Sequence, residues 1–518
     1  MSQDTTYYIT TPIYYVNDKP HIGHAYTTLA CDVIARFMRL DGRKVMFLTG
    51  TDEHGQKVEK SARDRGIEPL TYADQVSDNF RHLAQAMNCT NDDFIRTTEK
   101  RHQKAAQTLW NTLLEKGEIY LGAYEGWYSV RDEAFYGEDE LKEGANGEKL
   151  APTNAAVEWV AEPSYFFRLS AWRERLLTFY QENPDFIAPK SRRNEVISFV
   201  KQDLRDLSVS RTSFKWGIPV PNNQDHVMYV WLDALTNYLT AAGYPDTKSD
   251  AFTSFWPANV HVVGKDILRF HAIYWPAFLL AADIAPPKRV YAHGWWTNEG
   301  EKISKSLGNI IDPYELVTTY GLDAVRYFLL REIPFGNDGD FSHKAFVQRV
   351  NGDLANDIGN LSQRVLTMIF KNCDRQIPVP EAFEAIDQAL LNTAYGLLLK
   401  VRLSVETQAL HTMLADIWAV VGDCNRYVDE QAPWVLKKTD HGRMRTVLYV
   451  LAEVIRVIAL MAQPVMPGSM DKMLSQLKIS ADDRTMAFVS ANHALACGTA
   501  IDKPEGIFPR FVTPEAPE

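Results

Sequence analysis

Two histidines flank a short apolar pair in His21-Ile22-Gly23-His24, directly after Pro20. Residues 7–11 form an aromatic and β-branched run typical of a strand, and a helical pattern extends from the histidines to about Leu40. A strand, a loop and a helix N-terminus form the place where doubly wound sheets bind nucleotides. The imidazoles could donate to a phosphate chain, and the glycine would let a ligand approach the backbone. Two solvated histidines at a helix start explain the pattern equally well.

A second group with chemical potential lies about 280 residues later, in Lys302-Ile303-Ser304-Lys305-Ser306. It places two lysines three residues apart with hydroxyls beside them, on a loop closed by Gly308. Substitution at the α-phosphate of ATP builds negative charge on the phosphoryl oxygens and on the departing pyrophosphate, and two ammonium groups would stabilise it. An ordinary polar loop is the alternative. The Walker, Gly-x-Gly-x-x-Gly and His-Glu-x-x-His motifs are absent from the sequence, so phosphate would be held by other means.

The elements that must position these groups follow an α/β pattern from Tyr7 to about Glu118. Residues 44–50 form a buried-type strand followed by the polar residues 51–55, as at the ligand crevice of a doubly wound sheet. Short aromatic strands then predict a small β-rich insertion. The α/β pattern resumes near Val220 with a helix over 229–238. From about Ser342 to Ile501 the pattern is helical, with long helices over 389–414 and 445–461, as in a helix bundle.

Composition sets limits on the class of protein. With 518 residues, 46 % hydrophobic and 23 % charged, the chain should form roughly three globular domains. Five widely spaced cysteines predict neither a disulfide framework nor a zinc site, and without an apparent secretory signal the cytoplasm is the expected location. The apolar tract 447–466 contains Glu453 and Arg456, so we expect a core helix and no membrane association.

A net charge of −11 argues against unspecific nucleic-acid binding but leaves room for a local basic face. Between residues 190 and 215 seven basic side chains stand against three acidic ones (Glu195, Asp203 and Asp206), a local charge of 7 − 3 = +4. The basic ones are Lys190, Arg192, Arg193, Lys201, Arg205, Arg211 and Lys215. They form either a phosphate-contact surface or an ordinary solvated face.

The two motifs with chemical potential resemble the signature sequences of the class I aminoacyl-tRNA synthetases, with Ile303 where that family usually has methionine. Within the class, five further segments resemble the methionyl-tRNA synthetase family in order and spacing: 11–17, 49–55, 230–234, 264–267 and 425–434. The resemblance extends from about Tyr7 to Arg510 and points to a short form without zinc.

The resemblance implies a methionine–tRNA ligase that activates methionine with ATP to methionyl-adenylate and transfers it to the 3′-terminal adenosine of tRNA(Met), including initiator tRNA. ATP with Mg²⁺ would be the co-substrate. The implied fold is an α/β Rossmann-like catalytic domain with an inserted small β-rich connective domain, followed by an all-α anticodon-binding helix bundle. The expected segments are the first catalytic half (1–118), the insertion (119–215), the second catalytic half (216–290), a stem-contact region with the lysine loop (291–345) and the helical domain with its tail (346–518).

By the same resemblance His21, His24, Lys302 and Lys305 would be catalytic. ATP would also contact Gly23, Gly264, Asp266 through its ribose hydroxyls, Trp296 and Ser304. Asp52 would bind the α-ammonium of methionine, and the rest of the pocket would be formed by Ile13, Tyr15, Trp231, Ala234, Leu235, Tyr238, His271 and Trp275. A carboxylate suits an ammonium group, and aromatic rings suit a polarizable sulfur. Leu235 replaces a proline of some relatives, and from the residues alone Trp231 and Trp275 fit core packing better.

The helical domain would read the anticodon, because proteins recognise single-stranded bases by stacking and by hydrogen bonds to their edges. The resemblance assigns base contacts to Asn356, Asn360 and Arg364, whose i, i+4, i+8 spacing places them on one helix face. Trp434, after Pro433, would be the stacking platform. Without the family, such a stripe is more often solvated surface.

Two departures from the family pattern matter. Ser129 and Asp132 stand where many relatives have a zinc-binding cysteine pair, and the sequence from 119 to 218 contains neither Cys nor His, so we expect no metal in the insertion. The sequence also stops shortly after Arg510, without the dimerising domain of some relatives, which favours a monomer. Two rivals stay open: a class I synthetase for another aliphatic amino acid, and a non-catalytic tRNA-binding paralogue.

Overall fold

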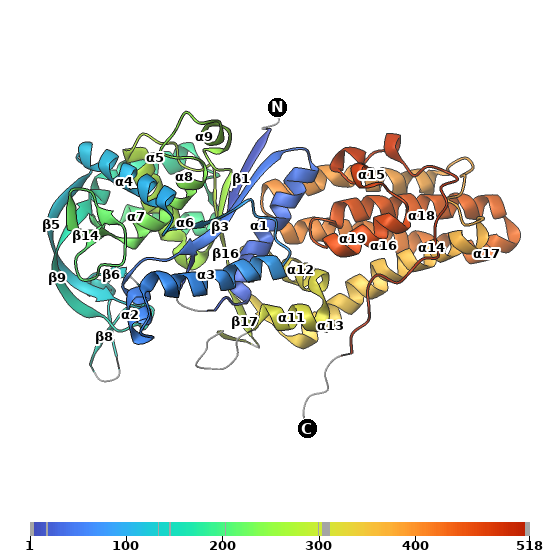
Figure 1. Cartoon of the computed structure of the whole chain (residues 1–518). Coiled ribbons are helices and arrows are strands. Elements are labelled where there is room, and N and C mark those ends of the chain that lie inside the picture. Colours follow the sequence, from blue (N-terminus) through green and yellow to red (C-terminus); the bar gives the residue numbers. More distant parts are fainter. Residues whose placement is uncertain are drawn as a thin grey trace, which may run out of the picture. The chain divides into compact units, whose positions relative to one another are not determined.

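The computed structural model describes residues 5–16, 19–132, 134–144, 147–202, 204–298, 300–302 and 311–512. The contacts divide the chain into two compact units (Figure 1). Unit 1 comprises residues 1–5, 21–45 and 294–518, and unit 2 comprises residues 6–20 and 46–293. Among the described residues, no helix is long and apolar enough to cross a bilayer.

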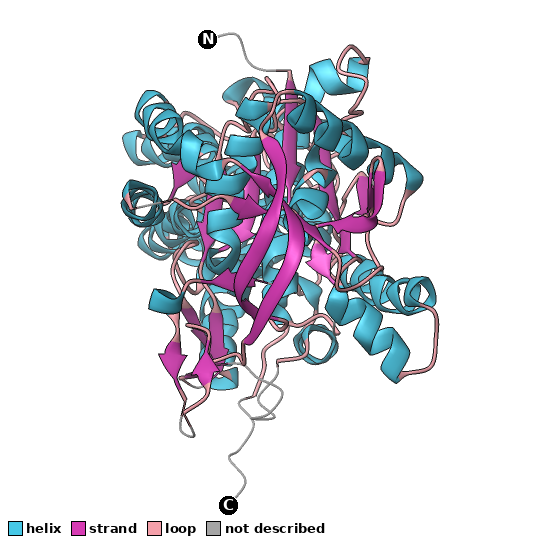
Figure 2. Ribbon diagram, turned by 90° about the vertical axis from the view of Figure 1, so that its left-hand side faces the viewer, coloured by secondary structure: helices cyan, strands magenta, loops and turns pink. Residues whose placement is uncertain are grey.

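Unit 2 is organised on a seven-stranded sheet, whose twisted strands are visible in Figure 2. The strand order is β10-β16-β15-β1-β3-β2, with β4 also paired to β3, and the pairs with a described register are parallel. The strands are β1 (Thr6–Thr10), β2 (Tyr14–Tyr15), β3 (Lys44–Asp52), β4 (Asp93–Arg96), β10 (Ile187–Ala188), β15 (Val260–Gly264) and β16 (Val290–His293). Most apolar residues of these strands are buried, as expected of a parallel sheet covered by helices. The predicted Rossmann-like sheet is therefore confirmed.

Helices connect and cover these strands. They are α2 (Gln56–Asp64), α3 (Pro69–Ala86), α4 (Lys100–Glu115), α5 (Arg173–Glu182), α6 (Lys190–Lys201), α7 (Val230–Leu235), α8 (Asn237–Ala241), α9 (Asp250–Phe255) and α10 (Trp275–Ala281), with the π-helical turn η4 (Phe270–Tyr274) before α10. The helix predicted over 229–238 is divided at Thr236 into α7 and α8. Trp110 and Trp275 are among the largest fully buried side chains.

The β-rich insertion is confirmed as an antiparallel sheet of order β11-β9-β5-β6. Its two long strands, β5 (Ile119–Ser129) and β9 (Glu158–Phe167), pair with each other (Figure 1). β6 (Ala134–Tyr136) pairs with β5, and β11 (Leu207–Ser208) pairs with β9. β7 (Lys142–Glu143) pairs with β8 (Lys149–Leu150), and β14 (Asn223–Met228) lies between β12 (Ser210–Arg211) and β13 (Pro219–Val220). β10, from the middle of the chain between β9 and β11, joins the main sheet through β16.

The basic surface predicted over 190–215 is not continuous. Arg211 is only 1 % exposed; its guanidinium is paired with Glu162 and lies over the ring of Tyr128, 4.1 Å from the ring centroid. Arg193 donates to the carbonyl of Tyr180 at 3.0 Å. The prediction was wrong for these side chains, since they serve internal contacts that the sequence count of charges cannot reveal.

Unit 1 combines helix α1 (Ile22–Leu40) with the C-terminal part of the chain. A three-stranded sheet of order β18-β17-β19 consists of β17 (Trp296–Asn298), β18 (Glu301–Lys302) and β19 (Gly339–Phe341). The helices are α11 (Pro313–Tyr320), α12 (Leu322–Arg331), α13 (His343–Arg349), the π-helical η6 (Val350–Gly359), α14 (Asn360–Asn372), α15 (Ala385–Glu406), α16 (Leu410–Gln431), α17 (Pro433–Thr439), α18 (His441–Ala462) and α19 (Pro467–Gln476). The predicted all-α bundle is confirmed, and every residue of α18 from Thr446 to Ala462 is buried.

One predicted helix is wrong. The pattern over 389–414 does not form a single helix, because the chain turns between α15 and α16, where Gln408 adopts a φ of 56°. The side-chain amide of Gln408 donates to the carbonyls of Val405 and Glu406 at the end of α15. These carbonyls have no partner within the helix, and the glutamine satisfies them at a turn that contains neither Gly nor Pro.

Candidate functional site

The N-terminus of α1 is capped by both histidines of the first motif. The Gly23 N–H donates to His21 Nδ1 at 3.1 Å, and the His21 N–H donates to His24 Nδ1 at the same distance. The arrangement is a capping box in which imidazoles replace the usual hydroxyl and carboxylate side chains. A Cβ at position 23 would lie 2.9 Å from His21 Cε1, so only glycine leaves room for this cap.

This cap determines the protonation of the two imidazoles. Each Nδ1 accepts a backbone N–H, so a neutral ring carries its proton on Nε2. Burial and, next, the neighbouring His21 ring hold the pKa of His24 well below its usual range, and the two ring centroids are 4.0 Å apart. Nε2–H donors at a helix N-terminus are chemically suited to an anion such as a phosphate.

The second motif begins on the small sheet of unit 1. Lys302 ends β18 and its backbone is in register with Thr297 of β17; Ser304 and Lys305 lie outside the described residues. Trp296, also on β17, is buried with the ring of Tyr26 from α1 edge-on at 5.6 Å. The structure thus brings Trp296 against the helix that carries the two histidines.

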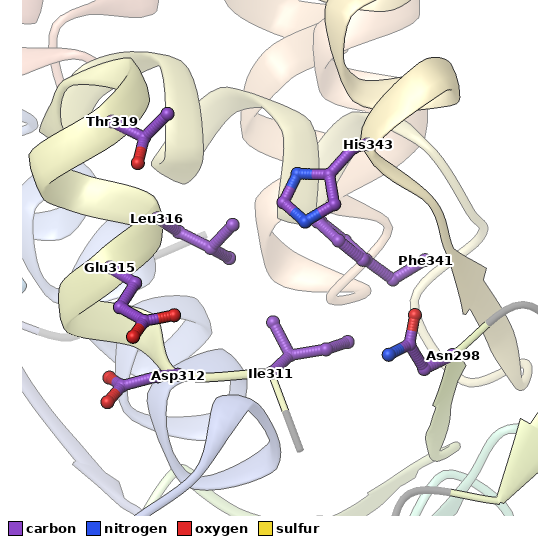
Figure 3. A pocket seen from close by; sticks show the side chains of 8 residues that line it. All are labelled: Asn298, Ile311, Asp312, Glu315, Leu316, Thr319, Phe341 and His343. Carbon is purple, nitrogen blue, oxygen red and sulfur yellow. The ribbon is translucent and has the colours of Figure 1, made fainter. Parts of the chain in front are cut away.

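A cavity lies beside this sheet (Figure 3). It is lined by Asn298, Ile311, Asp312, Glu315, Leu316, Thr319, Phe341 and His343. Asp312 and Glu315 supply carboxylates, and His343 Nδ1 is 2.8 Å from the Tyr320 hydroxyl. None of the described residues predicted to bind ATP or methionine lines this cavity.

In unit 2, the predicted methionine-binding carboxylate Asp52 is the last residue of β3. The backbone of Tyr15 on β2 is in register with Asp52, and the Val16 N–H donates to the Asp52 carbonyl at 3.1 Å. Ile13 precedes β2 and packs against the main apolar core. Three predicted pocket residues therefore meet at the carboxyl end of neighbouring parallel strands, where doubly wound sheets bind ligands.

The two residues after Asp52 are engaged in buried polar contacts. Glu53 is fully buried, and its carboxylate accepts two hydrogen bonds from Arg96: Nε donates to Oε1 at 2.6 Å, and Nη2 donates to Oε2 at 3.0 Å. His54 Nδ1 donates to Asp233 Oδ2 at 2.6 Å. The loop that follows β3 is consequently held through both Glu53 and His54. The carboxylate of Asp52 is therefore carried by a rigid backbone.

The predicted aromatic residues lie in two separate sets of ring contacts: Tyr238 contacts His271 and Trp275, and Trp231 contacts Phe270. The Tyr238 hydroxyl donates to His271 Nε2 at 2.8 Å, and the rings of Tyr238 and Trp275 lie 6.1 Å apart. Trp231 is stacked on Phe270 with centroids 3.5 Å apart and planes 8° from parallel. Ala234 and Leu235 are buried on the same helix as Trp231. Phe270 was not predicted, although its place one residue before His271 was a usable signal.

Gly264 and Asp266 lie at the end of β15, next to β1 in the sheet. A Cβ on residue 264 would lie 2.5 Å from Asp266 Oδ1. The glycine therefore allows the carboxylate of Asp266 to fold back over the strand end, a position from which it could accept hydrogen bonds from ribose hydroxyls.

The predicted anticodon residues lie along η6 and α14. Arg364 Nη1 is 3.1 Å from Asp429 Oδ1, and its guanidinium lies 5.5 Å from the centroid of the Trp434 ring. Trp434 is 42 % exposed, at the start of α17 after the buried Pro433. Asn356 Oδ1 accepts from Arg510 Nη2 at 2.6 Å. Asn360 begins α14, where the π-helical turn ends. π-Helical turns are frequent at functional positions.

The turn between β5 and β6 of the insertion is held by hydrogen bonds that involve Asp132. Tyr136 and Thr153 donate their hydroxyls to its carboxylate, and its own N–H donates to the Ser129 hydroxyl. Within the part of the chain that the structure describes, no group of three His, Cys, Asp or Glu could hold a metal ion.

Two family models match the chain. The first, described as tRNA synthetases class I (M), matches residues 7–366. The second, described as the anticodon binding domain of methionyl tRNA ligase, matches residues 378–516.

Curated relatives match over nearly the whole chain. The chain is 56 % identical over 506 residues to "Methionine--tRNA ligase" of Brucella suis, covering 98 % of each chain. It is 58 % identical over 517 residues to the protein of the same name from Rickettsia bellii, covering 98 % of this chain and 99 % of that one.

A solved structure shares the fold. Mycobacterium tuberculosis methionyl-tRNA synthetase in complex with methionyl-adenylate matches with a TM-score of 0.95 and 53 % identity, covering 98 % of this chain and 100 % of that one.

Proposed function

The chain belongs to the methionyl family of the class I tRNA synthetases, and we propose that the residues described above carry out the two steps of joining methionine to tRNA. In the first step ATP activates methionine to methionyl-adenylate with release of pyrophosphate. In the second the 3′-terminal adenosine of tRNA takes the methionyl group. The observation that carries this function is the identity of 56–58 % over 98 % of the chain to methionine–tRNA ligases.

In the activation step, the methionine carboxylate attacks the α-phosphorus in line and the bond to the pyrophosphate oxygen breaks. His21 and His24 stabilise the phosphate oxygens through their Nε2–H donors, and Lys302 and Lys305 stabilise the charge on the departing pyrophosphate. The shared capping box supports this role, because it holds both imidazoles in the donor tautomer before ATP arrives. Catalysis is then positioning and charge stabilisation, without a covalent enzyme intermediate.

Methionine recognition belongs to residues of unit 2. Asp52 pairs with the α-ammonium, and Ile13, Tyr15 and the aromatic group of Trp231, Tyr238, His271 and Trp275 surround the thioether. Ala234 and Leu235 complete the pocket. Gly264 and Asp266 serve the adenosine, together with Gly23, Trp296 and Ser304 on the ATP. The location of Asp52 and Gly264 at the carboxyl ends of parallel strands supports these assignments.

The helical part of unit 1 recognises tRNA(Met), including initiator tRNA. Trp434 is the stacking platform, and Asn356, Asn360 and Arg364 bond to the base edges. The exposed indole beside a guanidinium supports this role, since both planes stack on unpaired bases. Pro433 fixes the start of the helix that presents Trp434.

The conditions of the reaction are also part of the proposal. Mg²⁺ enters with ATP, because a divalent cation neutralises the phosphate charge. All five cysteines are free thiols, which supports work in a reducing compartment such as the cytoplasm. The working form is a monomer without zinc, which light scattering and metal analysis would test.

An exchange assay with the twenty amino acids tests the function. Methionine should support ATP–pyrophosphate exchange. Chemically similar amino acids such as homocysteine should be poorer substrates, since one methylene is worth about 1–3 kcal/mol in such a pocket. Exchange with another aliphatic amino acid in preference to methionine would identify a different synthetase. No exchange with any amino acid would identify a non-catalytic paralogue.

A further inference from the structure

One buried carboxylate in unit 2 links three elements and has been given no role so far. Asp233 on α7 is fully buried. Its Oδ2 accepts from His54 Nδ1 at 2.6 Å, and its Oδ1 accepts from His102 Nε2 at 2.8 Å. His102, on α4, is also fully buried, and His54 is 4 % exposed.

The hydrogen bonds define which atoms carry protons. An ionised carboxylate only accepts, so His54 must be protonated at Nδ1 and His102 at Nε2. Burial alone would raise the pKa of Asp233, but the charge of His54 and the hydrogen bonds from both histidines outweigh it and hold this pKa below its usual range. Asp233 is therefore a carboxylate that accepts one hydrogen bond from each of two histidines, each on a different oxygen.

The two histidines tie Asp233 to different segments of unit 2. His54 follows Asp52 by two residues on the loop after β3, which also receives Trp216 Nε1 at the Glu53 carbonyl, 2.5 Å away. Asp233 lies between Trp231 and Ala234 on α7. The bond from His54 to Asp233 thus ties the ammonium-binding end of the proposed methionine pocket to the helix that contacts the thioether. His102 ties the same carboxylate to α4, which carries none of the proposed substrate contacts.

We propose that Asp233, acting through His54, is a positioning residue for methionine: it holds the loop that carries Asp52 at the separation from α7 that matches the length of the substrate. The proposal rests on the methionine-binding residues proposed above. A misplacement of the ammonium partner by a fraction of an ångström weakens its charge-assisted hydrogen bonds. Loss of the His54–Asp233 bond should therefore weaken the binding of methionine and leave the binding of ATP unchanged.

A matched pair of variants separates positioning from core stability. His54→Leu and His102→Leu each remove one donor from the same buried carboxylate, and each should lower the thermal midpoint. For His54→Leu we expect the KM of methionine in pyrophosphate exchange to rise about tenfold or more with the KM of ATP unchanged. For His102→Leu we expect an unchanged KM of methionine. Equal changes in both variants, or no change in His54→Leu, would overturn the proposal.

Two further variants make the test robust if His54→Leu does not fold. His54→Asn retains a donor near the position of Nδ1 and should restore most of the methionine affinity. Asp233→Asn keeps the volume but can accept from only one histidine, so its KM for methionine should also rise; a folded Asp233→Asn with wild-type KM contradicts the proposal. The wild-type protein is measured alongside. If it does not use methionine at all, the proposed function fails, which is a result distinct from failure of the positioning role.

Discussion

His271 illustrates how a single side chain in the proposed pocket is held neutral. Its Nδ1 donates to the Ile267 carbonyl at 2.9 Å, while its Nε2 accepts from Tyr238. Burial lowers the pKa of His271 to about 4, against the weaker opposing effects of the Ile267 bond and Asp266. At neutral pH the ring therefore carries one proton, on Nδ1, and directs the Tyr238 hydroxyl.

This pKa predicts how stability depends on pH. A histidine in the unfolded chain titrates near pH 6.5. Between about pH 6.5 and pH 4, residue 271 is therefore protonated in the unfolded state and neutral in the folded state. The contribution is present above pH 6.5 and is lost as pH falls towards 4, and it amounts to about 2 kcal/mol between pH 7 and pH 5. Urea unfolding at both pH values should show a smaller loss in His271→Gln than in the wild type. An equal loss in both would show that His271 is already charged in the folded protein.

At the residue scale, the sequence indicates candidate members of the site but not the bonds that hold them. Resemblance pointed to Asp52, Trp231 and His271, and the structure places Asp52 at the end of β3, Trp231 against Phe270 and His271 beside Tyr238. The His54–Asp233 bond spans 179 positions. No local pattern tells which distant carboxylate a histidine will meet, because that pairing is decided by tertiary packing.

Helix α1 is the element on which the phosphate chemistry depends. In Gly23→Ala the new Cβ would approach His21 Cε1 to 2.9 Å and displace the capping imidazole. Loss of an N-cap costs about 1 kcal/mol, whereas alanine in place of glycine within a helix gains about the same amount. We therefore expect little change in thermal midpoint, but at least a tenfold lower kcat of pyrophosphate exchange.

Gly396→Ala is the matched control for that experiment. Gly396 lies inside α15 with nothing near the place of a new Cβ, so the substitution should raise stability and leave exchange unchanged. A Gly23→Ala protein with wild-type exchange would mean that the orientation of His21 does not matter.

The start of α17 makes a separate prediction about tRNA. Trp434→Ala removes the proposed stacking platform, and stacking of one base is worth about 1–3 kcal/mol. The KM of tRNA in aminoacylation should therefore rise about 5- to 150-fold. Val435→Ala, which truncates the adjacent exposed side chain, should leave this KM unchanged. Equal effects of the two variants would remove Trp434 from the recognition surface.

The elements themselves were predictable wherever apolar periodicity was long. α1, the strands around Asp52 and Gly264, and the bundle helix over 445–461 occur where the pattern places them. The break after Glu406 was missed because Gln408 adopts a positive φ without the usual glycine or asparagine. The π-helical turn at Asn356 was missed as well, since its buried residues Val350, Leu354, Ala355 and Ile358 follow a spacing that an α-helix also shows.

At the scale of the molecule, two ion pairs within unit 1 join the helix of the first motif to the helical region. Arg326 Nη2 on α12 donates to Asp32 of α1 at 2.7 Å and to the Pro464 carbonyl at 2.9 Å. Arg402 of α15 bonds Asp41 at the end of α1 with a shortest distance of 2.6 Å. Removing one member of the fully buried Arg326–Asp32 pair should cost about 3–5 kcal/mol. The helix that carries His21 and His24 is thus a structural part of the unit that contains the proposed tRNA-reading surface.

The central claim is that cationic and imidazole groups perform the phosphate chemistry separately from methionine recognition. The most direct measurement is methionine-dependent ATP–pyrophosphate exchange by Lys305→Ala, with methionine affinity measured on the same protein by tryptophan fluorescence. We predict that exchange slows at least a hundredfold, about 3 kcal/mol of lost transition-state stabilisation, while methionine affinity is unchanged. Exchange at the full rate, or a loss of exchange explained entirely by weaker methionine binding, would contradict the account.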